Sequence, residues 1–183
     1  MKTRQINILL TSLLGMILLT FSSGWAIPDP ASTGPVITHA FAAEVGKYGD
    51  PLKFYIEADD PISDMLRVAI VVDQVGYGHY PTDWVYLPQK DEHHFAGYLQ
   101  WNTFSSNASK MPEWTQLTVK ISVFDTSGHE SNTVVFPLEF VSNRVERVNP
   151  PAPFDSANLE RLGHIDINLY NPNEMGNELK RRW

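Results

Sequence analysis

Acidic side chains gather in two polar breaks of this sequence, and carboxylates are the groups with which proteins bind calcium. The first break lies around Pro61 and the second follows a long apolar stretch, and together they hold five candidates: Asp59, Asp60, Asp64, Asp125 and Glu130. A Ca²⁺ ion takes six to eight oxygen ligands, so the two breaks would have to meet in space. If the fold brings them to one end, the sequence predicts a structural Ca²⁺ site. It predicts no other cofactor.

A simpler interpretation is that each of these carboxylates closes its own turn. Aspartate is a turn former because its side chain accepts hydrogen bonds from nearby backbone N–H groups. The dense Asp-Xaa-Asp-Xaa-Asp spacing of a dedicated calcium loop does not occur in the sequence. This absence favours turn closure, and the calcium interpretation stays open beside it.

The histidines and the catalytic motifs give no sign of an enzyme. His93 and His94 are adjacent, so on a strand they would point to opposite faces, and no His-Xaa-His or His-Xaa-Xaa-Xaa-His pair occurs. The sequence has no Gly-Xaa-Ser-Xaa-Gly elbow, no P-loop, no dinucleotide fingerprint and no cysteine. We therefore predict a protein that is not an enzyme, with a small secreted hydrolase as the least favoured alternative.

Aromatic side chains in the middle of the chain form a second candidate site. Flat rings on a surface can stack on sugars or anchor a protein partner. Trp84 and Tyr86 stand on one short predicted strand, and the rings of the group are too many to be all buried. The alternative is that such rings fill the core. The whole group comprises Tyr77, Tyr80, Trp84, Tyr86, Tyr98 and Trp101.

The elements that must position these residues are β-strands. Residues 117–124 and 134–140 alternate between apolar and other side chains, and this period of two predicts a hairpin with one buried face. Five further strands are predicted over residues 36–42, 52–58, 66–72, 84–87 and 94–101. Because a hairpin with one apolar face needs a second sheet to cover it, the sequence predicts an all-β, antiparallel sandwich of about seven strands.

Three stretches resemble bacterial immunoglobulin-like and fibronectin-type-III-like modules. They are Gly49–Pro61 (GDPLKFYIEADDP), Leu66–Val72 (LRVAIVV) and Val119–Asn132 (VKISVFDTSGHESN), within residues 35–141. The resemblance implies an immunoglobulin-like sandwich in which the two acidic breaks lie at the same end. The sequence departs from the antibody pattern, because it lacks the cysteine pair, the tryptophan of the third strand and the tyrosine corner. The resemblance therefore implies a fold and no particular partner.

Residues 142–183 form a C-terminal extension with its own pattern. A proline-rich stretch at 149–153 predicts a stiff spacer, residues 155–163 predict one short helix, and the alternation at 165–170 predicts one extra strand. A lone strand must join a sheet edge, either its own or that of another chain. We predict that this strand is the interaction element, with the turn at 125–130 as a second surface. Its residues are Ile165, Ile167, Leu169 and Tyr170.

The N-terminus predicts export. Lys2 and Arg4 precede an apolar run over residues 6–21, and Gly24-Trp25-Ala26 offers small residues to a signal peptidase. We predict a signal peptide at 1–26, a linker at 27–34 and a periplasmic or extracellular location. An uncleaved membrane anchor is the alternative, because the run falls just short of the ~20 residues of a typical membrane helix.

Charge and composition narrow the class of partner. The formal net charge is −7, and a surface of this sign repels phosphate backbones and anionic lipid headgroups. We therefore predict no nucleic-acid partner, and membrane contact only through an uncleaved N-terminal segment. The predicted function is an exported protein-interaction module, such as an accessory subunit of a cell-envelope assembly. Carbohydrate binding through Trp84 and Tyr86 is the alternative.

Overall fold

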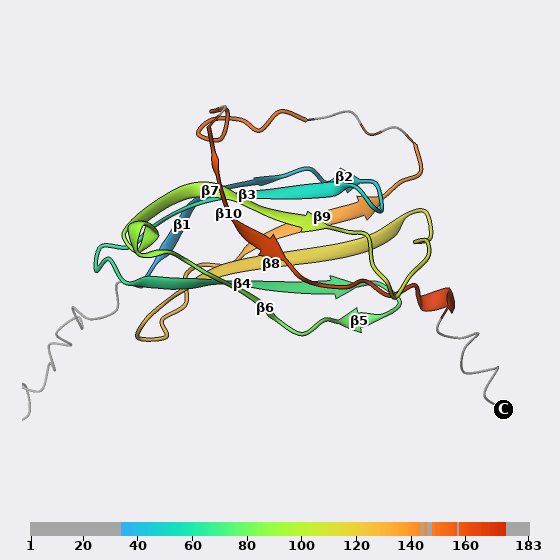
Figure 1. The fold of residues 1–183 in the computed structure, drawn as a ribbon, viewed down its shortest axis with the longest axis horizontal. Coiled ribbons are helices and arrows are strands. Elements are labelled where there is room, and N and C mark those ends of the chain that lie inside the picture. Colours follow the sequence, from blue (N-terminus) through green and yellow to red (C-terminus); the bar gives the residue numbers. More distant parts are fainter. Residues whose placement is uncertain (1–33, 144, 146–147, 157, 175–183) are drawn as a thin grey trace, which may run out of the picture. The chain divides into compact units, whose positions relative to one another are not determined.

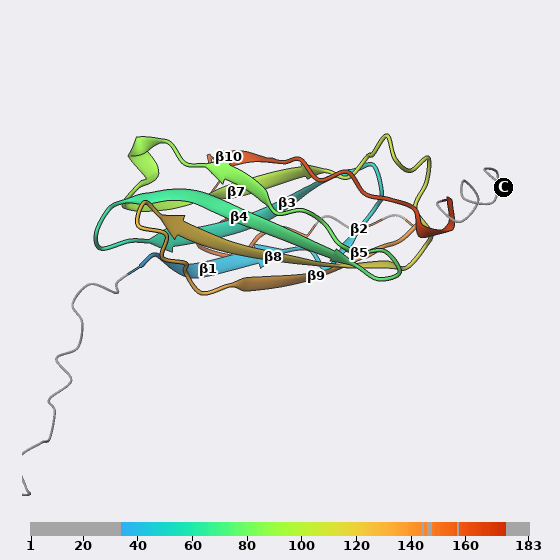
Figure 2. The ribbon, with the colours of Figure 1, turned by 90° about the horizontal axis from the view of Figure 1, so that it is seen from below.

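The computed structural model describes residues 34–143, 145, 148–156 and 158–174, which belong to one unit of the chain, Ser32–Trp183. Two sheets face each other, as Figures 1 and 2 show. The first sheet holds, in order, β1 (Val36–Ala42), β3 (Pro51–Asp59), β7 (His94–Asn102) and β10 (Glu160–Ile165). The second holds β2 (Val45–Gly46), β9 (Val134–Phe140), β8 (Thr115–Asp125), β4 (Met65–Gln74) and β5 (Gly78–His79). Strand β6 (Asp83–Tyr86) also pairs with β4, and a short 3-10 helix, η1 (Gln89–Asp91), precedes β7.

The strand order is that of an immunoglobulin-like sandwich. The orders β1-β3-β7 and β9-β8-β4 reproduce the A-B-E and G-F-C strands of that fold. The predicted all-β immunoglobulin-like sandwich is therefore confirmed, and all seven strands predicted before residue 142 are present. The predicted signal peptide lies outside the described residues, as does the linker except for Gly34. None of the helices in the described part of the chain is long and apolar enough to cross a membrane.

Two strand pairs correct the prediction of purely antiparallel sheets. Strand β2 runs parallel to β9, because the chain moves from the first sheet to the second after β1 and keeps its direction. Strand β10 runs parallel to β7. The connection after β9 first returns to the end of the sandwich at which β7 begins, as Figure 1 shows, so β10 enters in the same direction as β7.

The alternating residues predicted for the core fill the space between the sheets. Every second residue of β8 from Leu117 to Val123 is buried, and so are the inward residues of β3, β4 and β7 that face them. Trp101 is fully buried, and its indole N–H donates a hydrogen bond to the Ile167 carbonyl oxygen at 3.0 Å. This ring therefore fills the core and holds the C-terminal segment against it.

The C-terminal extension continues the sandwich. Strand β10 begins at Glu160, inside the segment for which a helix was predicted, and ends at Ile165, where the extra strand was predicted to begin. A Cβ added to Gly97 would lie 2.6 Å from the Glu160 carbonyl oxygen, and one added to Gly163 would lie 2.4 Å from Cγ1 of Val85. These two glycines let β10 approach both β7 and β6, so Gly163 serves close packing and does not end a helix. A helical turn follows only at residues 172–174.

The predicted interaction element lies in the protein's own core. Ile165, Ile167 and Leu169 are 5%, 7% and 0% exposed, and β10 pairs with β7 of the same chain. Only Ile165 of the predicted strand at 165–170 belongs to β10, and β10 completes the chain's own sheet, which was one of the two alternatives. The prediction that these three side chains meet a partner is corrected, because burial in the core leaves them no surface to offer.

Tyr170, the fourth residue of that element, is fastened through its backbone. The Tyr80 hydroxyl donates to Oε1 of Gln74 at 2.5 Å, and the Gln74 amide donates to the Tyr170 carbonyl at 2.9 Å. The Tyr170 N–H in turn donates to the Tyr80 oxygen at 2.9 Å. Burial raises the pKa of Tyr80 to about 12. This closed set of hydrogen bonds ties the C-terminal segment to the second sheet.

Candidate functional site

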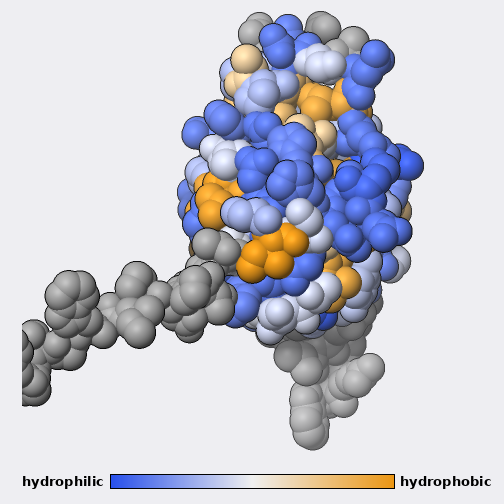
Figure 3. Space-filling view, turned by 90° about the vertical axis from the view of Figure 1, so that its left-hand side faces the viewer, coloured by the Kyte–Doolittle hydropathy of each residue, from blue (hydrophilic) through white to orange (hydrophobic). Residues whose placement is uncertain are grey.

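The two acidic loops meet at one end of the sandwich, as the immunoglobulin-like resemblance implies. Thr126 of the β8–β9 loop donates its backbone N–H to the Asp64 carbonyl at 3.0 Å, and its hydroxyl lies 2.5 Å from Oδ2 of Asp64. Figure 3 shows the end of the molecule on the left of Figure 1, where most of the surface is hydrophilic and hydrophobic residues form separate patches. Both loops therefore contribute to one polar surface.

Two of the predicted calcium ligands close the loops in which they stand. The carboxylate of Asp60, which is 1% exposed, accepts hydrogen bonds from the backbone N–H of Ile62 at 2.9 Å and of Asp64 at 3.3 Å. Asp125 accepts one from the N–H of His129 at 2.7 Å and contacts its imidazole at 2.7 Å. Burial raises the pKa of the Asp125 carboxyl, but the hydrogen bonds from His129 lower it by more, so this pKa lies below its usual range.

The other three predicted ligands do not converge on these two. Asp59 pairs with Nδ1 of His94 at 2.8 Å on the outer face of the first sheet, and Glu130 is exposed. Oδ1 of Asp64 is buried and has no hydrogen-bond partner among the described residues. Within this part of the chain, no group of three His, Asp or Glu side chains is placed to hold a metal ion. The calcium site stays a prediction from the sequence.

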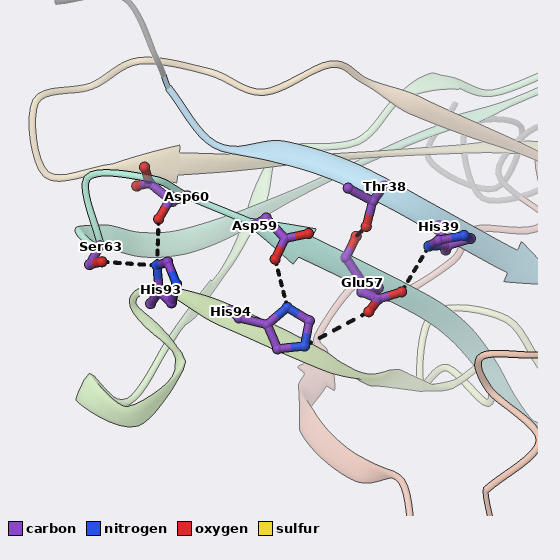
Figure 4. A network of polar contacts seen from close by, with 8 residues as sticks. All are labelled: Thr38, His39, Glu57, Asp59, Asp60, Ser63, His93 and His94. Atoms are coloured by element: carbon purple, nitrogen blue, oxygen red, sulfur yellow. Dashed lines mark hydrogen bonds and ion pairs between the residues drawn. The ribbon is translucent and has the colours of Figure 1, made fainter.

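Histidine and carboxylate side chains form a line across the outer face of the first sheet (Figure 4). The Glu57 carboxylate on β3 lies 2.8 Å from Nδ1 of His39 on β1 and 3.8 Å from Nε2 of His94 on β7. The strand register makes these contacts, because His39 lies opposite Glu57 and Asp59 lies opposite His94. No sequence pattern predicts this line, since its members come from three strands and only the register brings them together.

Ser63 and His93 lie together at the same end but are not arranged as a nucleophile and its base. Nδ1 of His93 is 2.9 Å from the Ser63 hydroxyl and 2.8 Å from the Asp60 carbonyl oxygen (Figure 4). A carbonyl oxygen can only accept, so Nδ1 carries the hydrogen in this contact. A protonated ring nitrogen cannot take the serine proton, and this geometry gives Ser63 no activating base.

On the outer face of the second sheet, Arg67 lies over the ring of Trp84, which packs edge-to-face with Phe124 at a centroid distance of 5.4 Å. Its guanidinium carbon is 3.9 Å from the ring centroid of Trp84 on β6 and 5.9 Å from that of Phe124 on β8. Tyr86 lies opposite Arg67 in the β4–β6 register and is 63% exposed. No carboxylate of the described residues lies within ion-pairing distance of Arg67. We call Arg67, Trp84, Tyr86 and Phe124 the arginine patch.

The outer face of the first sheet carries a row of three rings, one from each of β1, β3 and β7. Phe41 lies opposite Tyr55 and Tyr55 lies opposite Tyr98, with ring centroids 6.1 and 5.8 Å apart. Phe154, from the connection between β9 and β10, packs on Tyr55 at 5.6 Å. The connection therefore covers part of the row and leaves a groove beside it. The sequence pattern placed Tyr98 in the aromatic group but gave no reason to pair it with Tyr55.

Comparisons with known proteins add two distant structural likenesses. Neither a protein-family model nor a curated protein matches this chain. The chain is similar to the PKD domain of an M14-like peptidase from Thermoplasmatales archaeon SCGC AB-540-F20, with 14% identity over 60% of this chain and 97% of that one and a TM-score of 0.37. It is also similar to the CARDB domain of a Pyrococcus furiosus protein, solved in complex with di-metal ions, with 8% identity over 60% and 90% and a TM-score of 0.34. Likenesses this distant carry no argument about function.

Proposed function

We propose that this protein is an exported, non-catalytic protein-interaction module that contacts its partner through the arginine patch on the second sheet. The observation that supports the proposal most is Arg67, which stacks on Trp84 and lies opposite the exposed Tyr86 in the strand register. Arginine, tryptophan and tyrosine are the residue types that dominate binding energies at protein interfaces. A guanidinium already fixed by stacking also loses little conformational freedom when a partner binds.

The free guanidinium indicates the chemistry of the partner surface. Although the chain contains 21 acidic residues, none of the described ones pairs with Arg67. A planar guanidinium binds a carboxylate through two parallel hydrogen bonds. We therefore expect the partner to present an Asp or Glu to Arg67, with apolar side chains around it to cover the Tyr86 ring.

Export and an accessory role belong to the same proposal. The basic residues Lys2 and Arg4, followed by the apolar run at 6–21, support passage through a secretory route. A small exported module of this kind would hold a partner within an envelope assembly.

Affinity capture from an envelope extract tests this proposal. The baits are the tagged full-length protein, the double variant Arg67→Gln with Tyr86→Ser, and Tyr98→Ala as a matched control on the opposite sheet. We expect the wild type and Tyr98→Ala to enrich the same protein and the double variant to lose it. In the wild-type complex, an amine-reactive cross-linker should join that protein to Lys120 on β8. Circular dichroism would verify that each bait is folded. Capture of the same protein by a folded double variant would contradict the proposal.

A further inference from the structure

We propose that the groove on the outer face of the first sheet is a saccharide-binding site. Its volume is about 450 Å³, and the residues that the argument uses are Lys53, Tyr55, Tyr98, Asn149, Asp155 and Ser156. Pockets of this size accommodate small ligands. The site lies on the sheet opposite the arginine patch, so it is independent of the protein interaction proposed above. We call it the tyrosine groove.

Two tyrosine rings form a rigid aromatic floor. Tyr55 and Tyr98 lie opposite each other on β3 and β7, with an interplanar angle of 50°. Phe154, which is 2% exposed, packs on Tyr55 with the ring centroids 5.6 Å apart. Burial, and secondly the neighbouring Tyr98, raise the pKa of Tyr55, so its hydroxyl keeps its proton and can donate. Rings held in this way present an apolar surface beside polar hydroxyls, which is what the two sides of a sugar ring require.

The polar groups around this floor have no protein partner. Among the described residues, the two tyrosine hydroxyls, the Asn149 amide and the Asp155 carboxylate form no hydrogen bond with the protein. The Lys53 ammonium lies 4.1 Å from the Tyr98 ring centroid, and no carboxylate of the described residues pairs with it. These groups are free to bind a ligand.

Their chemistry matches sugar hydroxyls. A hydroxyl group is at once a donor and an acceptor, so a saccharide site needs groups of both kinds. Lys53 can only donate, ionised Asp155 can only accept, and Asn149 and Ser156 can do both. The groove holds all of them around the aromatic floor.

Other ligand classes fit the groove less well. An apolar ligand would strip water from these polar groups without replacing its hydrogen bonds. A phosphate would meet Asp155 within a chain whose net charge is −7. A peptide that adds as a strand needs a free sheet edge, whereas β3 lies between β1 and β7, and β7 lies between β3 and β10. A proline-rich peptide docking on the rings is the remaining competitor.

A glycan array probed with the labelled full-length protein tests the site. The array should carry neutral, amino and acidic oligosaccharides, and the free form of the best-bound tetrasaccharide should then be titrated calorimetrically. We expect Tyr98→Ala to weaken binding about tenfold or more, which corresponds to a free-energy change of about 1.4 kcal/mol. Asp155→Asn, at an exposed position, is the second variant and should weaken binding several-fold without affecting folding. Tyr86→Ala, in the arginine patch, is the control and should bind as the wild type does.

Three results would overturn the proposal. One is the absence of binding to every glycan on the array. Another is equal affinity of the wild type, Tyr98→Ala and Asp155→Asn for the bound glycan. The third is selective binding of a synthetic Asn-Pro-Pro-Ala-Pro-Phe peptide, the sequence of residues 149–154, in place of any glycan. None of these results depends on whether the arginine patch captures a protein, so the two proposals can fail separately.

Discussion

The two outer faces of the sandwich carry similar residues but differ in what covers them. Each face has a basic side chain over an aromatic ring, Lys53 over Tyr98 at 4.1 Å on the first sheet and Arg67 over Trp84 at 3.9 Å on the second. The connection between β9 and β10 packs Phe154 on the first face, and the rings there border a groove. On the second face, Tyr86 stays exposed beside Arg67. The difference is therefore one of shape, because the covering segment borders a groove of about 450 Å³ on the first face, whereas the second face presents an uncovered ring.

The largest effect should come from removing the covering segment. Deletion of residues 149–183 takes away four buried apolar side chains and uncovers Trp101, so we expect the sandwich to unfold. Loss of one buried Leu or Ile side chain costs about 2–5 kcal/mol, and a whole domain is stable by only about 5–15 kcal/mol. Circular dichroism and a thermal melt measure the outcome. A cooperative melt at the wild-type temperature would show that the first face needs no such cover. The four side chains are Phe154, Ile165, Ile167 and Leu169.

A single substitution should open the groove without removing the segment. Phe154→Ala is expected to lower the free energy of unfolding by about 3–5 kcal/mol, because the Phe154 ring is buried against Tyr55. Phe104→Ala is the matched control, since that ring is 64% exposed and its loss should change stability by less than about 0.5 kcal/mol. Urea denaturation of both variants checks the prediction. If Phe154→Ala lowered the free energy of unfolding as little as Phe104→Ala does, the Phe154 ring would not be buried against Tyr55 in solution.

The hydrogen bonds that hold the C-terminal segment should lose their contribution to stability at alkaline pH. Because the folded pKa of Tyr80 is raised from 10.0 to about 12, its contribution to stability is present below pH 10 and is lost as pH rises through about 12. Tyr80→Phe should remove this alkaline dependence and cost about 1 kcal/mol at neutral pH through the lost hydrogen bonds. Tyr77→Phe is the control, since Tyr77 stacks on the same tyrosines. Unfolding free energies at several pH values between 8 and 12 provide the measurement, and an unchanged slope in Tyr80→Phe would contradict the account.

The two stacked cations should affect binding far more than folding. Lys53→Ala is expected to lower the free energy of unfolding by only about 0.5–1 kcal/mol because Lys53 is exposed, and Arg67→Ala by about 1–2 kcal/mol because Arg67 is half-buried over Trp84. Arg67→Ala should abolish capture of the protein partner and leave saccharide binding intact. Lys53→Ala should weaken saccharide binding and leave capture of the protein partner intact. If both variants lost the same activity, the two faces would form one site.

Calcium removal should have the smallest effect. Asp60 and Asp125 already accept hydrogen bonds that close their own loops, so we expect a chelator to leave the melting temperature unchanged. A calcium site filled at a hundred times its dissociation constant would add about 2.7 kcal/mol, which a melt resolves easily. A clear drop in melting temperature with chelator would establish the calcium site that the sequence predicts.

The fold could be predicted from the sequence where the signal is local. The alternation from Leu117 to Val123 gave the correct buried face of β8, because the side chains of a strand alternate whatever its partner is. In the C-terminal extension, local sequence patterns do not suffice to predict the structure. Gly163 has the sequence context of a helix stop, but its function is to let β10 pack against Val85, a residue 78 positions earlier. Only the tertiary packing determines which of these two roles a glycine has.

The candidate sites were predicted only in part, for the same reason. Trp84 and Tyr86 were predicted to stand on one short strand, and the structure confirms that strand as β6. Arg67 and Phe124 complete the arginine patch from two other strands, and Tyr55 meets Tyr98 across a strand pair. Phe154 reaches the first face from a segment that the sequence presents as a spacer. Each of these contacts requires the strand register or the course of a long connection, and neither can be read from a single sequence.

The central claim is that the two outer faces bind separate partners, and hydrogen–deuterium exchange of the full chain tests it most directly. Exchange would be measured for the free protein, for the protein saturated with the tetrasaccharide identified on the array, and for its complex with the captured protein. We predict saccharide protection confined to residues 53–55, 98–100 and 149–159, and partner protection confined to residues 67–71, 83–86 and 120–124. Overlapping footprints, or protection of neither face, would contradict the account.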